Sequence, residues 1–230
     1  RRRFVSDASH ELKTPLAGIR LLTDSILQTD NMDPDTTKEF VTDIGREAER
    51  LSRITENLLR LTRLDGGVVQ AAYPVAVGPV LQRVERMLGM VAEEKGVTIS
   101  GSASEDAVAL ATDDDVHQIL YNLMENAIKY SAPGGRITVK LWAGEYKAFI
   151  ELIDQGRGIP PEDLENVKTK FYKGSNSVRG SGIGLALVDS IMTALDGTMD
   201  IQSTLGRGTV VTLGLSLIHI SEPTRLRRIS

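Results

Sequence analysis

The sequence from residue 4 to residue 16 reads Phe4-Val5-Ser6-Asp7-Ala8-Ser9-His10-Glu11-Leu12-Lys13-Thr14-Pro15-Leu16, and it decides how the N-terminal part of the chain folds. Its apolar residues recur at steps of three and four, which predicts a helix with one apolar stripe. The stripe consists of Phe4, Ala8, Leu12, Leu16, Ile19, Leu22 and Ile26. His10 falls roughly opposite it, so we expect an exposed imidazole.

Two neighbours of His10 add to this expectation. Glu11 can accept the ring proton, and Pro15 lacks the amide that would bond back along the helix, so a bend is expected one turn past the histidine. On His10 alone, an amphipathic surface helix with an incidental histidine is the favoured interpretation.

A second helix is predicted after a turn, with Asp33 as N-cap and Pro34 at the first helical position. It has its own apolar stripe: Phe40, Ile44, Ala48, Leu51, Ile54, Leu58 and Leu61. A lone hairpin cannot bury both stripes well, whereas two copies around a two-fold axis form a four-helix bundle. We therefore predict a homodimer, with packing of the hairpin on a second domain as the alternative.

Composition narrows the class of protein. The 230 residues are 41% hydrophobic and 25% charged, and the net charge of -4 argues against general nucleic-acid binding. The absence of cysteine excludes disulfides and thiolate-bound zinc. No apolar run approaches the roughly 20 residues of a membrane span. Because the predicted helix is already under way at the first residues, we expect a fragment whose upstream part is missing.

The remaining sequence predicts an α+β protein in which the hairpin, residues 1–66, is joined by a linker, 67–73, to an α/β sandwich, 74–214. This second domain should have a mixed sheet covered by helices. Its expected elements are strands near 73–77, 97–100 and 107–111, helices at 78–95, after an Asp113 cap and at 182–195, and hairpins at 136–153 and around 206–208.

Three polar residues mark one face of the helix after Asp113. Asn122, Asn126 and Lys129 follow one another at helical spacing, away from the apolar positions. Amide oxygens suit Mg²⁺ and an ammonium suits phosphate. A solvated helix face is the alternative, although asparagine is a poor helix former.

A carboxylate at a strand end forms a second candidate site. Asp154 ends an apolar strand and is followed by Gly156 and Gly158, which permit close backbone approach. Such an acceptor would face the 6-amino group of adenine and disfavour guanine. A plain Asp-x-Gly turn is the alternative.

A glycine-rich segment with Gly180, Gly182 and Gly184 opens the last helix, where free amides attract phosphate. The preceding loop contains Phe171-Tyr172-Lys173 among basic residues, a pattern typical of a lid over phosphates, or of a solvated charged loop.

These motifs occur in a recognisable order. Ser9-His10-Glu11-Leu12-Lys13-Thr14-Pro15-Leu16 resembles the phosphoacceptor box of sensor histidine kinases. Asn-Leu-Met-Glu-Asn-Ala-Ile-Lys-Tyr at 122–130, Asp-Gln-Gly-Arg-Gly-Ile-Pro at 154–160, Phe-Tyr-Lys-Gly at 171–174 and Gly-Ser-Gly-Ile-Gly-Leu-Ala-Leu at 180–187 resemble the N, G1, F and G2 boxes of that family. The resemblance covers residues 1 to about 214.

The resemblance implies a two-component kinase that phosphorylates His10 from ATP and Mg²⁺ and then phosphorylates an aspartate of a response regulator receiver domain. It implies Glu11 as base and Thr14 as the residue that places the water in regulator dephosphorylation. It implies Mg²⁺ on Asn126 and adenine on Asp154. The other implied nucleotide residues are Asn122, Lys129, Tyr130, Gly156, Gly158, Lys173, Gly180, Gly182 and Gly184.

Several alternatives stay open beside this one. An enzyme that mainly dephosphorylates the regulator, or a nucleotide-binding scaffold without turnover, would have the same motifs. The chain would be a cytoplasmic domain, and the family leaves room for a membrane-anchored parent. Residues 215–230 resemble a translated sequencing adapter and are predicted to be non-native, with a genuine basic tail as the alternative.

Overall fold

A computed structural model describes residues 2–104, 107–174 and 180–217, and the chain divides into two compact units. The first comprises residues 1–69 and 165–190, and the second comprises 70–164 and 191–230. The first unit therefore contains both the N-terminal hairpin and the segment with the predicted lid residues 171–173.

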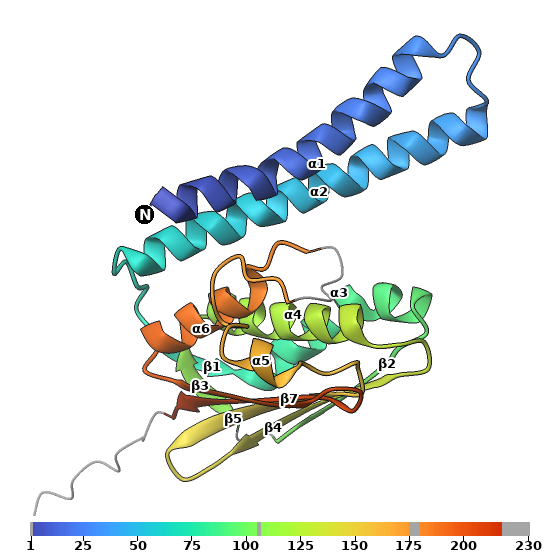
Figure 1. Ribbon diagram of the computed structural model, residues 1–230. Helices are drawn as coiled ribbons and strands as arrows, with labels where there is room; N and C mark the ends of the chain where they lie inside the picture. Colours follow the sequence, from blue (N-terminus) through green and yellow to red (C-terminus); the bar gives the residue numbers. More distant parts are fainter. Residues whose placement is uncertain (1, 105–106, 175–179, 218–230) are drawn as a thin grey trace, which may run out of the picture. The chain divides into compact units, whose positions relative to one another are not determined.

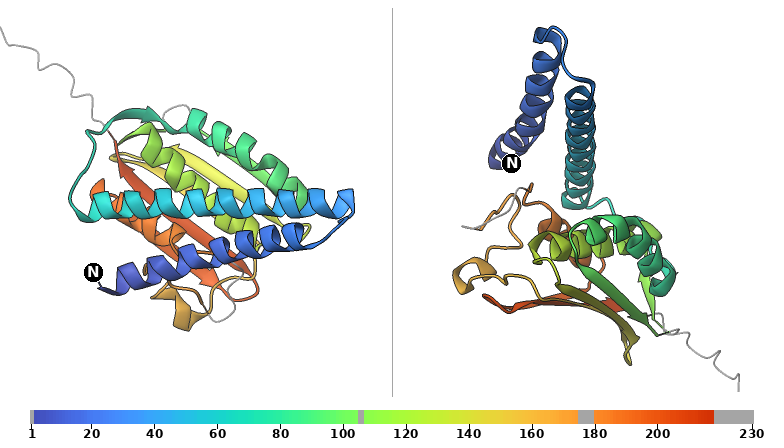
Figure 2. Two further views of the ribbon diagram at one scale, coloured as in Figure 1. Left: turned by 90° about the horizontal axis from the view of Figure 1, so that it is seen from above. Right: turned by 90° about the vertical axis from the view of Figure 1, so that its right-hand side faces the viewer.

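Two long helices, α1 (Arg2–Gln28) and α2 (Pro34–Asp65), run side by side in the first unit (Figure 1). Asp33 caps α2 as predicted, because its carboxylate accepts hydrogen bonds from the amides of Asp35 and Thr36. The helix α1 continues without interruption through Pro15. Figure 2 shows the hairpin from two further directions.

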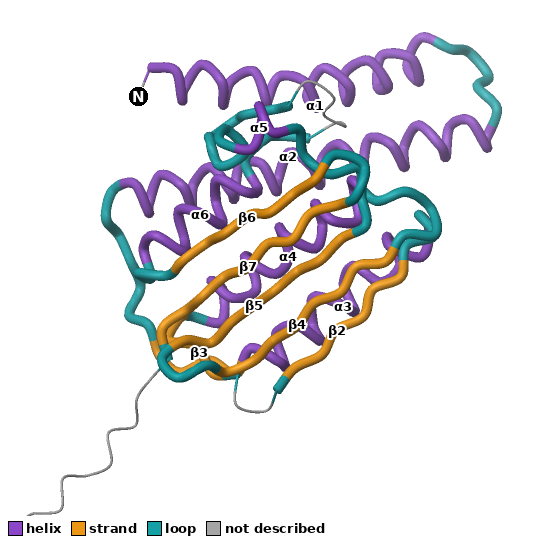
Figure 3. The backbone as a smooth tube through the Cα atoms, turned by 60° about the horizontal axis from the view of Figure 1, so that its bottom comes forward, coloured by secondary structure: helices purple, strands orange, loops and turns teal. Residues whose placement is uncertain are grey.

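The second unit is built on a five-stranded sheet in the order β2-β4-β5-β7-β6 (Figure 3). Its strands are β2 (Thr98–Ala103), β4 (Arg136–Ala143), β5 (Lys147–Asp154), β6 (Thr198–Thr204) and β7 (Gly208–Ser216). The pairing of β2 with β4 is parallel and the other pairings are antiparallel, so the sheet is mixed as predicted. A separate antiparallel pair joins β1 (Tyr73–Ala76) to β3 (Val108–Ala111).

Helices α3 (Val77–Glu94) and α4 (Asp113–Tyr130) cover one face of this sheet (Figures 1 and 3). They bury an apolar core against it, which includes Val84, Leu88, Ile119, Leu123, Ile137, Val139, Ile150 and Leu213. The predicted α+β class with a helix-covered sheet is thereby confirmed. The remaining helices are α5 (Pro161–Leu164), which lies in the loop between Asp154 and the glycine-rich segment, and α6 (Gly184–Ala194).

Two boundaries differ from the prediction. The N-cap of α4 is Thr112 rather than Asp113, because Thr112 and Asp115 form a reciprocal capping box. The last strand also continues past residue 214: Leu215 is fully buried and pairs with Ala148, and Ser216 pairs with Lys147. These two residues belong to the sheet rather than to the predicted tail, and residues 218–230 lie outside the described part of the chain.

The burial of Leu215 gives a stability prediction. Leu215→Ala should lower the free energy of unfolding by about 2–5 kcal/mol, since it leaves a cavity in the core. Urea unfolding would measure this. Leu205→Ala is the matched control, because that side chain is 58% exposed and should change stability by no more than about 0.5 kcal/mol. Equal effects of the two substitutions would show that Leu215 is not part of the core.

Candidate functional site

The imidazole of His10 is exposed on α1, as the position of the apolar stripe predicts. Thr14 is also exposed one turn later, and its hydroxyl donates to the carbonyl of His10 at 3.3 Å. The two side chains therefore lie on the same side of the helix. An exposed histidine next to a hydroxyl and a carboxylate can exchange a group with a second molecule.

Glu11 meets Lys173, the predicted lid lysine, within the first unit. Lys173 Nζ donates to Glu11 Oε1, although the two residues are 162 positions apart in the sequence. Two further contacts of the same unit accompany this pair: Phe4 and Phe171 pack edge to face at 5.6 Å, and Lys170 Nζ lies 2.6 Å from Asp65 Oδ2. The predicted base and the predicted lid residue are thus brought together.

The glycine-rich segment of the first unit has a steric requirement at Gly182. Its φ is 68°, and an added Cβ would lie 2.7 Å from the carbonyl carbon of Phe171. The amide of Phe171 donates to the carbonyl of Gly182, which ties the lid to this segment. Gly180 is half-buried and Gly184 begins α6, whereas Arg179 lies outside the described residues.

In the second unit, the polar residues of α4 differ in their surroundings. Asn122 is buried and its amide donates to the carbonyl of Gln118 at 2.7 Å, so it does not fit the alternative of a solvated helix face. Asn126 is half-buried, and its amide makes no hydrogen bond with the described part of the chain. Of the two amides, that of Asn126 is the one available to a ligand.

The ring of Tyr130 at the end of α4 contacts two cations. Lys129 Nζ lies 4.7 Å from the centre of its ring and donates to its hydroxyl at 3.1 Å. Arg157, which sequence reasoning did not single out, lies 4.6 Å from the same ring centre. Lys129 and Arg157 together give this end of the helix the positive charge that a phosphate chain requires.

Asp154 is the last residue of β5, as predicted. Its Oδ1 accepts hydrogen bonds from the amides of Gly156 at 2.8 Å and Thr209 at 3.3 Å. Its Oδ2 accepts none from the residues that the structure describes. Burial raises the pKa of Asp154 above its ordinary value, and the two amide bonds oppose this rise without cancelling it. A desolvated acceptor with one oxygen fixed and one oxygen open suits an amino group.

Gly158 has the second steric requirement in this region. Its φ is 68°, and an added Cβ would lie 2.1 Å from the carbonyl oxygen of Thr204. Gly156 lies against Tyr130, and the amide of Arg157 donates to the Tyr130 carbonyl at 3.3 Å. The loop after Asp154 and the end of α4 are therefore joined, which brings the predicted adenine and phosphate residues of this unit together.

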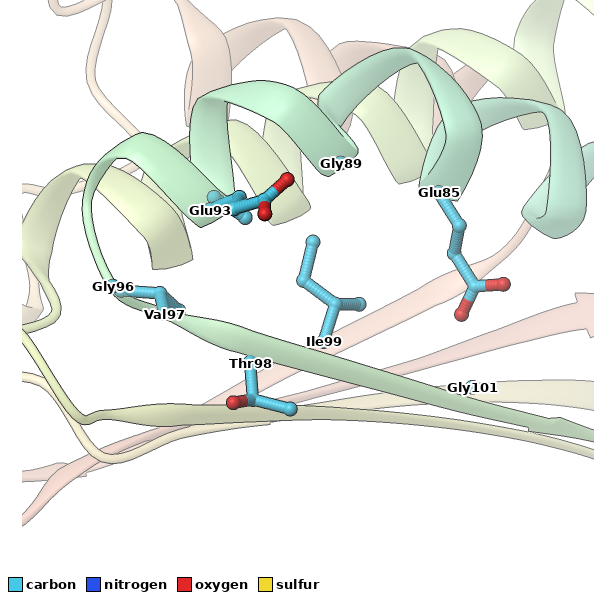
Figure 4. A pocket seen from close by; sticks show the side chains of 9 residues that line it. Glu85, Gly89, Glu93, Gly96, Val97, Thr98, Ile99 and Gly101 are labelled. Atoms are coloured by element: carbon cyan, nitrogen blue, oxygen red, sulfur yellow. The ribbon is translucent and has the colours of Figure 1, made fainter.

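A hollow of about 620 Å³ lies between α3 and β2 (Figure 4). Glu85, Glu93 and Ile99 are among the residues that line it, and the predicted nucleotide residues do not. We therefore place the candidate site at the end of α4 and not in this hollow. Among the described side chains, no group of three or more histidines and carboxylates is placed to hold a metal. None of the described helices is long and apolar enough to cross a membrane.

Two family models match this chain, and the second of them includes residues 165–190 of the first compact unit. Residues 1–67 match the family model "His Kinase A (phospho-acceptor) domain", and residues 111–219 match "Histidine kinase-, DNA gyrase B-, and HSP90-like ATPase". The Staphylococcus aureus protein "Sensor protein SrrB" is 30% identical over 219 residues, which cover 92% of this chain and 37% of SrrB. The chain thus spans little more than a third of the curated relatives that it matches.

Solved structures show the same fold. The Acinetobacter baumannii histidine kinase AdeS superimposes with a TM-score of 0.73 at 21% identity, over 90% of this chain and 97% of AdeS. The histidine kinase ThkA, solved in complex with the response regulator protein TrrA, superimposes with a TM-score of 0.70 at 18% identity, over 93% of this chain and 61% of that one.

Proposed function

Because the chain belongs to the sensor histidine kinases, we propose that it transfers the γ-phosphoryl group of ATP to its own His10 and then passes that group to an aspartate of a response regulator. The observation on which this rests is the exposed imidazole of His10 in a domain that matches the phosphoacceptor model. An exposed imidazole is accessible both to a nucleotide and to a second protein.

In the first step, a neutral ring nitrogen of His10 attacks the γ-phosphorus of ATP, and a nitrogen–phosphorus bond forms as the bond to the β-phosphate oxygen breaks. ADP leaves with the electron pair of that bond. Glu11 orients the ring and receives its proton, which requires that the carboxylate separate from Lys173.

The nucleotide is held by residues of the second unit. Asp154 Oδ2 accepts from the adenine amino group, while Lys129 and Tyr130, supported by Asn122, lie along the phosphates. Asn126 fits a Mg²⁺ ligand, because its amide oxygen is accessible and this ion keeps several waters beside a few protein oxygens. When bound, Mg²⁺ neutralises phosphate charge. For Lys173, Gly180, Gly182 and Gly184 of the first unit, we propose roles in the lid that accompanies ATP binding.

The second step requires partners. A receiver domain supplies the aspartate, and the solved complex of ThkA with TrrA is a kinase–regulator pair of this kind. A second copy of the chain supplies the other hairpin of a four-helix bundle, which the exposed Leu16 and Leu59 favour. We also propose that the kinase acts in the cytoplasm as part of a longer parent protein, which a membrane segment would anchor.

A predominantly phosphatase function has one supporting observation. Thr14 is exposed one turn after His10, where its hydroxyl could place the water that hydrolyses the phosphoaspartate. A scaffold without turnover is less well supported, since His10, Asn126 and Asp154 are all present and accessible.

Incubation of the purified protein with γ-labelled ATP and Mg²⁺ tests the proposal. We expect the protein to acquire a label that is lost in acid and survives alkali, as expected for a phosphoramidate. Chelation of the metal should prevent labelling. An acid-stable label would contradict phosphorylation on histidine. Nucleotide binding without any label would favour the scaffold.

A further inference from the structure

The side chain of Lys95 reaches from the end of α3 to the end of α4. Its Nζ donates to the carbonyl of Ile128 at 2.7 Å and also to the carbonyl of Lys129. These carbonyls belong to the last turn of α4, where backbone oxygens lack partners within the helix; the carbonyl of Ile128 also accepts from the amide of Ser131 at 3.3 Å. The ammonium therefore caps a helix other than its own, at the end where the helix dipole favours a cation.

This arrangement is energetically unusual for a lysine. Burial lowers the pKa of Lys95, and the nearby charge of Lys129 lowers it further. A part-buried ammonium beside a like charge is retained only if its donors find acceptors, which the two carbonyls provide. The backbone also joins the loops that follow these two helices, because the amide of Gly134 donates to the carbonyl of Gly96 at 2.7 Å.

The last turn of α4, which Lys95 caps, leads directly to the residues that we propose to lie along the phosphates of ATP. Lys129 and Tyr130 follow directly from the carbonyls that Lys95 holds, and Tyr130 is tied on its other side to the loop after Asp154 through the amide of Arg157. Lys95 thus fixes one side of the peptide chain at Lys129 and Tyr130, and the loop after Asp154 fixes the other. Asp154 itself makes no contact with Lys95 among the described interactions.

We propose that Lys95 is a positioning residue for the triphosphate, which sets the direction of Lys129 and Tyr130 without touching the nucleotide. This inference rests on the proposed ATP site. Lys95 lies outside residues 111–219, the part of the chain that the ATPase family model matches. Its contribution to the site therefore depends on a contact 33 to 34 residues distant in the sequence, which the structure reveals.

The test compares two ligands that differ only in the phosphates. Affinity for ATP with Mg²⁺ is measured by calorimetry, and affinity for adenosine by ligand-observed NMR, in the parent chain and in Lys95→Met. We expect the affinity for ATP to fall about tenfold, which is typical for the loss of a charged hydrogen-bond partner, while the affinity for adenosine stays within about twofold. Lys95→Arg retains donors for the carbonyls and should restore the affinity for ATP to within about threefold of the parent.

Lys140→Met is the matched control, because Lys140 lies on β4 and pairs with Glu151 on the sheet; its affinity for ATP should equal that of the parent. An unchanged affinity for ATP in Lys95→Met, or an equal fall for ATP and adenosine, would overturn the positioning role. If Lys95→Met does not fold, Lys95→Gln, which keeps one donor, gives the same comparison. A parent chain that binds neither ligand would refute the proposed function itself, which is a different result.

Discussion

Replacement of His10 by glutamine should abolish the acid-labile label completely. Glutamine is polar and compatible with an exposed helix position, so α1 should be preserved, but its amide nitrogen is not a nucleophile. The measurement is incorporation of labelled phosphate from ATP and Mg²⁺, with circular dichroism to verify the helix. This substitution should have the largest effect on labelling, because it removes the proposed accepting atom itself.

His117 provides the matched control. It is half-buried on α4, where its ring stacks on that of Tyr121 with the ring centres 6.2 Å apart. His117→Gln makes the same chemical change and should retain the label. Label that persists in His10→Gln would assign the phosphoacceptor to another residue and remove the basis of the proposed function.

Asp154→Asn should weaken nucleotide binding about ten- to a hundredfold, as expected for the loss of a charge-assisted hydrogen bond worth roughly 1.5–3 kcal/mol. The geometry determines which way the new amide points. Its oxygen takes the place of Oδ1, which accepts from Gly156 and Thr209, so its NH₂ group replaces Oδ2. Two amino groups then face each other where an acceptor is required. Asp200→Asn, an exposed carboxylate on β6, is the control for the change in charge.

The raised pKa of Asp154 adds a pH dependence to the same prediction. Acidification should weaken adenosine binding to the parent at a higher pH than an ordinary aspartate would allow, since the protonated carboxyl no longer accepts freely. A carboxyl with a raised pKa stabilises the folded state as it becomes protonated, so unfolding caused by this group cannot account for the loss. Binding to Asp154→Asn should lack this component. The same pH profile in parent and variant would remove Asp154 from the adenine pocket.

The helices were predictable from the sequence because their periodicity is strong and local. The stripes of α1 and α2 and the Asp33–Pro34 start depend on residues within a turn of one another. The position of Asp154 at the end of β5 was predictable for the same reason, since an apolar strand is followed directly by glycines.

Features that depend on distant partners were not predictable. The N-cap of α4 is an exception, because Thr112 and Asp115 are only three residues apart and form a local capping box; it was missed because Asp113 is also a good cap in isolation. The burial of Asn122 and the reach of Lys95 to Ile128 depend on how α3 and α4 pack. Leu215 was assigned to a tail because the stretch that begins at this residue resembles a translated sequencing adapter, whereas pairing with Ala148 places it in the sheet.

The two glycines at φ 68°, Gly158 and Gly182, determine what a relative without the proposed activity would look like. Every other amino acid has a Cβ, and at these positions a Cβ would collide with the chain's own backbone. A descendant that had lost catalysis but still needed a folded domain would therefore be expected to keep both glycines, and these motifs would survive in pseudokinases. His10 and Asn126 meet no such steric demand. The presence or loss of His10 and Asn126 would therefore distinguish an active enzyme from an inactive protein that retains the fold.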